Sequence, residues 1–153
     1  MDSKEIKRKL IHYFRFFRRY YFCATEVGEF YSDVMVANSK EVIEIEVKVD
    51  KYDLINDFKK KKHFHYKKKT KALLKYIPNK FYFAVPKHLV YIAEQYVKDT
   101  PYGIIMILEG KENTGNHKIK IIKRASFIHK EETAIRRTIL LRMGSEVYTA
   151  QSK

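Results

Sequence analysis

The chain is poor in cysteine, proline and glycine, and it contains no tryptophan. Its 153 residues include one cysteine, three prolines and five glycines. A single Cys23 cannot form an internal disulfide, so we expect a reducing, intracellular compartment, the cytoplasm of a cell or of a virus-infected host. No stretch rich in proline, glycine and serine divides the chain, which predicts one domain. A signal sequence and a long apolar run are also lacking, so we expect no stable membrane insertion.

Acidic residues are scarce relative to basic ones. The 32 Lys and Arg outnumber the 18 Asp and Glu, giving a formal charge of +14 and a pI near 9.7. Such an excess is typical of proteins that bind a polyanion, and nucleic acid is the first candidate. An anionic membrane surface is the second, because the basic stretch 7–21 also carries aromatic residues. A lysine-rich composition can also reflect the source genome or a solvated surface.

Apolar spacing predicts an α/β domain with a central mixed sheet flanked by helices on both faces. Helices are expected at 3–20, 89–97 and 131–148, and a further helix is expected to begin after Asp50 as its cap. Strands are expected at 21–27, 32–37, 41–50, 80–85, 102–108 and 119–123. Ser3 is the expected cap of the first helix. The last helix should turn Ile135, Ile139, Leu140 and Met143 inward. We expect a core at about 20–109, preceded by the basic amphipathic helix 3–20.

The strand EVIEIEVKVD, residues 41–50, separates two kinds of side chain. Successive residues of an extended chain point to opposite faces. One face carries the apolar residues Ile43, Ile45, Val47 and Val49, and the other carries the ionisable residues Glu44, Glu46, Lys48 and Asp50. The ionisable row is either a solvated face or a site.

Glu46 and Lys48 are spaced for work on one reacting centre. Their side chains leave the same face of the strand at points about 6 to 7 Å apart. Asp33 on the preceding strand becomes a neighbour of Glu46 if the two strands pair through the turn at 38–40. Two carboxylates suffice to hold Mg²⁺ or Mn²⁺ against a phosphate, and Lys48 would hold or deprotonate the attacking water and offset developing charge. Cross-strand ion pairs are the alternative explanation.

An Asp on one strand followed by Glu46-Val47-Lys48 on the next resembles the PD-(D/E)xK nuclease superfamily. The similarity is greatest to DNA-repair proteins of the MmcB type and covers about residues 24–86. The similar elements are Ala24-Thr25-Glu26-Val27, Asp33-Val34, Ile45-Glu46-Val47-Lys48-Val49, Asp53, Asp57, Lys59, Lys62-His63, Tyr66 and Phe81-Tyr82-Phe83-Ala84-Val85-Pro86, with weaker similarity at Tyr102-Gly103. The chain lacks a Pro before Asp33 and has Tyr31 where an Arg is often seen.

This resemblance implies a restriction-endonuclease-like core and cleavage of phosphodiester bonds in repair, recombination or genome processing. It implies catalytic roles for Asp33, Glu46 and Lys48, and it makes Glu26 a further metal-ligand candidate, although a glutamate at a strand end is often simply solvated. Many proteins of this kind pair, so the resemblance makes a homodimer one candidate and leaves the oligomeric state open. The first helix, the lysine cluster and the last forty or so residues lie outside the resemblance.

A lysine cluster at 59–69 contains seven lysines around Phe64 and Tyr66. Lysines neutralise phosphates and an aromatic ring can stack on an unpaired base. The expected nucleic-acid contacts are Lys59, Lys60, Lys62, Lys67, Lys68, Lys69 and Tyr66. A solvated helix end, with the two aromatic rings in the core, is the alternative. The lysines would repel a metal ion from His63 and His65, so we expect no zinc there.

Two main classes of function and a weaker third follow. The first is a Mg²⁺-dependent nuclease, with DNA the expected substrate and RNA left open. The second is a non-catalytic nucleic-acid-binding protein on the same fold, and a weaker third is a basic structural protein of a membrane or capsid. Two residues keep open roles: Glu44 is a partner of the site or an outward charge, and Lys59 is a phosphate contact or a surface lysine.

Overall fold

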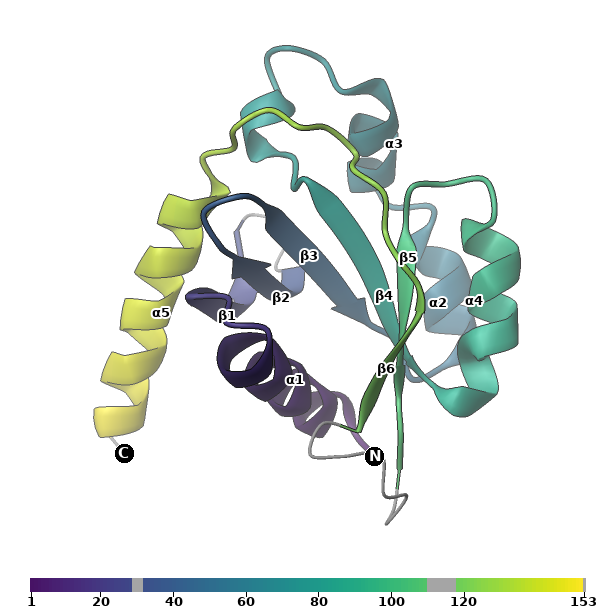
Figure 1. Cartoon of the computed structure of the whole chain (residues 1–153), viewed down its shortest axis with the longest axis horizontal. Helices are drawn as coiled ribbons and strands as arrows, with labels where there is room; N and C mark the ends of the chain where they lie inside the picture. The colour runs from purple at the N-terminus through teal and green to yellow at the C-terminus, as the bar shows by residue number, and fades with distance from the viewer. Residues whose placement is uncertain (29–31, 110–117, 153) are drawn as a thin grey trace.

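The computed structural model describes residues 1–28, 32–109 and 118–152, which form a six-stranded mixed sheet with helices on both faces (Figure 1). The strands are β1 (Phe22–Val27), β2 (Ser32–Ala37), β3 (Val42–Val47), β4 (Lys80–Pro86), β5 (Gly103–Ile107) and β6 (Ile119–Lys123). Their order in the sheet follows the sequence. Strands β1 to β3 pair antiparallel, β3 to β5 pair parallel, and β6 returns antiparallel. This confirms the expected α/β class.

The helices are α1 (Ser3–His12), a short π-helix η1 (Tyr13–Phe17), α2 (Lys51–Asp57), α3 (Lys61–Lys68), α4 (Val90–Val97) and α5 (Ile135–Gln151). Short 3₁₀ turns, η2 (Leu74–Tyr76) and η3 (Lys87–Leu89), precede β4 and α4. Asp50 caps α2 as expected, since its carboxylate accepts from the backbone N–H groups of Tyr52 and Asp53. The cap of α1 is Asp2 rather than Ser3, because the Asp2 carboxylate reaches the N–H of Glu5.

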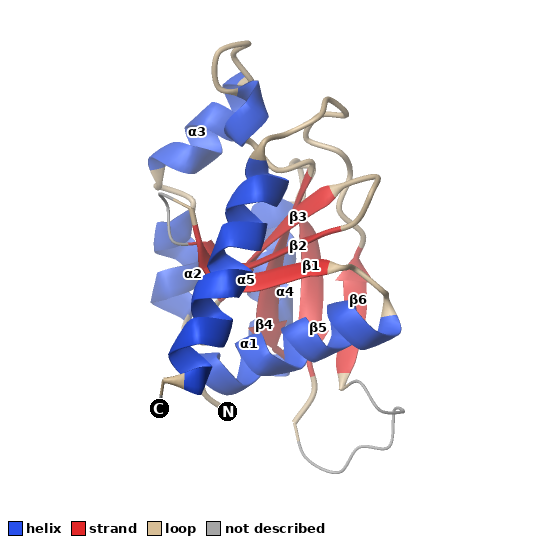
Figure 2. Cartoon of the chain, turned by 90° about the vertical axis from the view of Figure 1, so that its left-hand side faces the viewer, coloured by secondary structure: helices blue, strands red, loops and turns tan. Residues whose placement is uncertain are grey.

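Three apolar clusters surround the sheet. Helix α1 covers one face through Ile6 and Leu10, which pack on β2 and β3. On the other face, α5 packs on β1 and β2, while α2, α3 and α4 pack on β4 and β5. In Figure 2, α5 lies in front of the β1 edge. Glu44 and Glu46 lie on this second face between the two apolar clusters, because β3 places them beside Met35 and the phenylalanines of β4.

One alternative is excluded and one expectation is wrong. Glu44 and Glu46 of the ionisable row do not form a solvated face, because every residue of β3 is buried, whereas Asp50 beyond the strand is exposed. Leu140 does not point inward: it is 55% exposed, whereas Ile135 and Ile139 are buried. Adjacent residues of a helix point about 100° apart, so Leu140 turns away from the sheet once Ile139 faces it. No helix in the described ranges combines the length and the apolar character needed to cross a membrane.

The C-terminal part of the chain completes the sheet and contributes to both apolar clusters on the face that α4 and α5 cover. Strand β6 pairs with β5, Ile128 joins the cluster under α4, and Ile139 joins the cluster under α5. Asn79, just before β4, donates to the carbonyls of His129 and Glu131 and accepts from the N–H of Val42. Residues far apart in the sequence are therefore joined at one side chain.

Candidate active site

Asp33 and Glu46 meet where β2 and β3 separate. Regular pairing of the two strands stops at Val34 and Ile45. Beyond this point the backbone N–H of Val47 donates to the carboxylate of Asp33 at 2.8 Å. The Asp33 side chain thus takes the place of a backbone carbonyl of β2 as the acceptor for this N–H. The Asp33 carboxylate lies close enough to Glu46 to help raise the pKa of that carboxyl. The structure thus brings together the two carboxyl groups that hairpin pairing predicted to be neighbours.

Glu46 is nearly inaccessible to water, and its protonation reflects this position. Burial raises the pKa of Glu46 to about 8. The ammonium group of Lys62 opposes this rise, whereas Glu44 and Asp33 add to it. Burial therefore favours the neutral form of the Glu46 carboxyl, and a divalent cation would have to displace a proton or the Lys62 ammonium group to bind there.

Lys48 lies beside the carboxyl pair but contacts a different acid more closely. Its Nζ is 3.9 Å from Glu46 Oε2 and 2.7 Å from Asp57 Oδ1. Its backbone N–H is bonded to the carbonyl of Ala84 in β4. Strand β4 thus fixes the backbone of Lys48, and Asp57 at the end of α2 fixes its ammonium group.

Asp57 is the centre of a buried polar network. Its carboxylate receives the ammonium groups of Lys48 and Lys60 at 2.7 Å and the Nε2 of His63 at 2.7 Å. Burial alone would raise the pKa of Asp57, but the bonds from His63, Lys48 and Lys60 outweigh it and hold the pKa well below its ordinary range. His63 Nδ1 lies 2.7 Å from the hydroxyl of Tyr102, so both ring nitrogens of His63 are engaged within the protein.

A second buried network joins Glu44 to α3. Glu44 is 0% exposed and accepts from the hydroxyls of Ser32 and Tyr66. Lys62 Nζ lies 2.5 Å from Glu46 Oε1 and 3.5 Å from Glu44 Oε1. Burial alone would lower the pKa of Lys62, but Glu44 and Glu46 raise it to about 12. Glu44 is thus an internal partner of the site rather than an outward charge.

These contacts correct two expected nucleic-acid contacts. Lys62 is 2% exposed and Tyr66 is 4% exposed, so neither can clamp a phosphate or stack on a base. Helix α3 turns both inward because residues four apart share a helix face. The other expected contacts, Lys59, Lys60, Lys67, Lys68 and Lys69, are exposed, and Phe64 is exposed among them with Lys68 over its ring.

Glu26 does not join the carboxyl pair. Its carboxylate receives Lys7 Nζ at 2.5 Å, and the same ammonium group lies 3.2 Å from Asp33 Oδ1. Across the described ranges, no group of three or more His, Cys, Asp or Glu side chains is arranged to hold a metal ion. The fit to a divalent cation therefore depends on Asp33 and Glu46, a number that suits Mg²⁺, which usually keeps several waters.

Several residues of these networks had no place in the catalytic site that the sequence predicted. They are Lys7, Ser32, Asp57, Lys62, His63, Tyr66 and Tyr102. The four-residue spacing of Lys62 and Tyr66 was a usable signal, but a run of seven lysines conceals the one that faces inward. Lys7 gave no signal, since its contacts depend on how α1 crosses the sheet.

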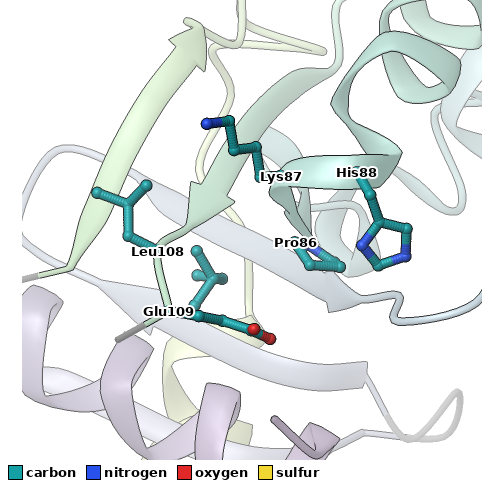
Figure 3. A pocket seen from close by; sticks show the side chains of 6 residues that line it. Pro86, Lys87, His88, Leu108 and Glu109 are labelled. Carbon is teal, nitrogen blue, oxygen red and sulfur yellow. The ribbon is translucent and has the colours of Figure 1, made fainter. Parts of the chain in front are cut away.

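A hollow of about 540 Å³ lies at the carboxyl ends of β4 and β5. Figure 3 shows Pro86 and His88 on one side of it and Leu108 and Glu109 on the other. Strands β3 and β4 are parallel neighbours, so the hollow and the carboxyl pair both lie toward the carboxyl ends of these strands. Lys87 and His88, which line the hollow, are exposed and place basic side chains at this end of the sheet.

Comparison with known proteins gives the fold alone. No family model and no curated protein matches the chain. Among solved structures, it is similar to the SPO1766 protein of unknown function from Silicibacter pomeroyi, with a TM-score of 0.58 and 14% sequence identity. The match covers 99% of this chain and 90% of that one. An identity this low supports a shared arrangement of helices and strands.

Proposed function

We propose that this protein is a divalent-cation-dependent nuclease that hydrolyses phosphodiester bonds, with DNA as the expected substrate. The observation that carries the proposal is the meeting of Asp33 and Glu46, with the ammonium group of Lys48 beside them. The PD-(D/E)xK resemblance, and its MmcB-type branch in particular, supports the same reaction. A role in DNA repair, recombination or genome processing, and pairing of two copies, remain predictions from that resemblance.

Asp33 and Glu46 are the residues that would hold Mg²⁺ or Mn²⁺. Both offer carboxylate oxygens, the ligands that these hard cations prefer. When bound, such an ion polarises the phosphate and lowers the pKa of a coordinated water. Burial, together with Glu44 and Asp33, raises the pKa of Glu46, so cation binding there would become more favourable as pH rises.

Lys48 supplies positive charge next to this pair. Its contact with Asp57 fixes the ammonium group near Glu46, where negative charge on an attacked phosphate would develop. Asp57 is in turn fixed by His63 and Lys60. A charge that is already in place needs no rearrangement during the reaction, which is why such positioning accelerates it.

Exposed cations near the site would hold the nucleic-acid backbone. Lys59 and Lys60 follow α2, and Lys67, Lys68 and Lys69 end α3. Lysine contacts neutralise phosphates without reading sequence. Exposed Phe64 offers a ring on which an unpaired base can stack.

A non-catalytic nucleic-acid-binding protein is the second candidate. It is favoured by one observation: Lys7 contacts Asp33, and Lys62 contacts Glu46, so each carboxyl of the pair already has an internal cation. A site neutralised in this way can be stable without a metal ion. The surface cations would then bind nucleic acid by themselves.

A cleavage assay separates the two candidates. Labelled linear, supercoiled and branched DNA, and RNA, are incubated with Mg²⁺, Mn²⁺ or EDTA and with wild type, Lys48→Ala or Lys51→Ala. Lys51 is exposed on α2 and provides a control in which the same charge is removed. We expect metal-dependent cleavage by wild type and Lys51→Ala and a loss of at least about 100-fold in Lys48→Ala, with binding retained. Equal binding without cleavage by any of the three proteins would establish the second candidate.

A further inference from the structure

We infer that Lys7 is an internal counter-ion of the candidate active site, which competes with the divalent cation for the carboxylate of Asp33 and withdraws to Glu26 when the cation binds. This inference rests on the proposed function. It assigns to helix α1, which lies outside the nuclease resemblance, a direct part in controlling the site.

The two oxygens of Asp33 have different partners. Oδ2 accepts from the N–H of Val47 and is thereby part of the junction between β2 and β3. Oδ1 faces Lys7 Nζ at 3.2 Å. Oδ1 is the oxygen without a backbone bond, so a cation that binds Asp33 through it meets the Lys7 ammonium group.

Lys7 has a closer acceptor to which it can withdraw. Its Nζ lies 2.5 Å from Glu26 Oε1, compared with 3.2 Å from Asp33 Oδ1. Giving up Asp33 would leave the ammonium group paired with Glu26 rather than unpaired. Both carboxylates help to raise the pKa of Lys7 against the opposing effect of burial, so the ammonium form persists.

The backbone at Glu26 places its side chain for this contact. Ala24 and Val27 both pack under α5, although residues three apart in a regular strand point to opposite faces. The break falls at Glu26, whose φ of 51° lies in the left-handed region that non-glycine residues rarely adopt. Such a conformation costs free energy and persists where surrounding contacts fix it, and Lys7 provides such a contact.

The Lys7 contacts are only partly screened by water. The Lys7 side chain is 19% exposed and that of Asp33 is 20% exposed. A unit charge at this distance and in these surroundings opposes a second cation by more than it would in bulk water. Removing the charge of Lys7 should therefore strengthen cation binding at Asp33.

Isothermal titration with Mn²⁺, in the absence of nucleic acid, tests the inference. Lys7→Met removes the charge and keeps most of the apolar stem, and Lys7→Arg keeps the charge. Lys4→Met is the matched control, because Lys4 is an exposed lysine of the same helix. We expect Lys7→Met to bind Mn²⁺ about tenfold more tightly than wild type, with Lys7→Arg and Lys4→Met within about twofold of wild type.

The outcomes test the inference and the proposed function separately. Mn²⁺ binding by wild type that Lys7→Met leaves unchanged or weakens would overturn the inference and leave the proposed function intact. Absence of Mn²⁺ binding in all variants would overturn both. Asp33→Asn, alone and combined with Lys7→Met, should abolish binding and so locates the ion at Asp33. Circular dichroism checks folding, and Lys7→Gln, which keeps hydrogen-bonding capacity without charge, replaces Lys7→Met if that variant does not fold.

Discussion

Glu46 is a buried acid whose proposed cation binding would depend on pH. Its pKa rises from 4.5 to about 8 on folding, chiefly because of burial. Between pH 4.5 and about 8, Glu46 keeps a proton in the folded chain that the unfolded chain has released. The contribution of Glu46 to the free energy of unfolding therefore falls as pH rises through this range. Above about pH 8 the folded protein carries a carboxylate that a cation could bind.

We therefore expect Mn²⁺ to raise the midpoint of thermal unfolding more at pH 9 than at pH 6. The measurement is a thermal melt followed by circular dichroism, with and without the ion. Glu46→Gln removes the titrating group, and its melts should lose most of the Mn²⁺ shift at pH 9. A shift of equal size at both pH values would contradict the role assigned to Glu46.

Lys62 and its neighbour Lys61 offer a matched test of buried against exposed charge. Lys62 is enclosed by Glu44 and Glu46, whereas Lys61 is exposed. Lys62→Met leaves two buried carboxyl groups without their cation and should lower the free energy of unfolding by about 3 to 5 kcal/mol. Lys61→Met should change it by less than about 0.5 kcal/mol. Urea unfolding measures both, and similar values for the two variants would disprove burial of Lys62.

The residues of the site differ in how far the sequence could predict their positions. Asp33 and Glu46 could be brought together because strand alternation and a short turn fix which side chains are neighbours. The inward turn of Lys62 and Tyr66 depends on how α3 rotates against the sheet, which packing decides. The position of Lys7 depends on the angle at which α1 crosses the sheet, and no local sequence pattern predicts that angle.

At the scale of elements, β5 depends on a residue without a side chain. A Cβ at Gly103 would overlap the ring of Tyr82 in β4 and come within 2.6 Å of the backbone nitrogen of Ala125. The ring and the backbone cannot both move aside in a packed core. Any side chain at residue 103 would therefore force β4 or the segment after β6 to shift.

Gly103→Ala should lower the free energy of unfolding by about 1 to 3 kcal/mol, through overpacking. Gly144 in α5 is the control, because a Cβ there would meet nothing within 4 Å. Gly144→Ala should instead raise stability by up to about 1 kcal/mol, because alanine favours a helix. Denaturant unfolding of the two variants should give effects of opposite sign, and a neutral Gly103→Ala would show that Tyr82 adapts.

Strands were easier to predict than helix faces. The strand at Ser32–Ala37 has the predicted bounds, because a short apolar run bordered by polar residues specifies both ends. In α5 the exposed Leu140 and Leu141 interrupt the amphipathic pattern, so periodicity alone assigned one of them to the core. Their exposure follows from how α5 packs, mainly on β1 and β2, rather than from a property of the local sequence.

For the whole molecule, the excess of 14 positive charges should govern binding to nucleic acid. Replacing Lys67, Lys68 and Lys69 by Gln removes three exposed charges at the end of α3. We expect the slope of log K against log salt concentration for duplex DNA to become less negative by up to about 0.9 for each phosphate that these lysines neutralise. Fluorescence anisotropy over a range of salt concentrations measures it. The same replacement at exposed Lys40, Lys98 and Lys120 is the control, and equal slopes for both triple variants would remove α3 from the binding surface.

The bonds of Asn79 bear on how far the chain can be shortened. Its amide links the start of β3 to residues 129 and 131, which follow the last strand. Ending the chain at residue 109 would remove those acceptors, together with Ile128, Ile139 and the strand that pairs with β5. The truncated protein would expose a hydrophobic parallel strand along its whole length, a surface on which chains add to one another. Aggregation, rather than a smaller folded unit, is the expected product of ending this chain at residue 109.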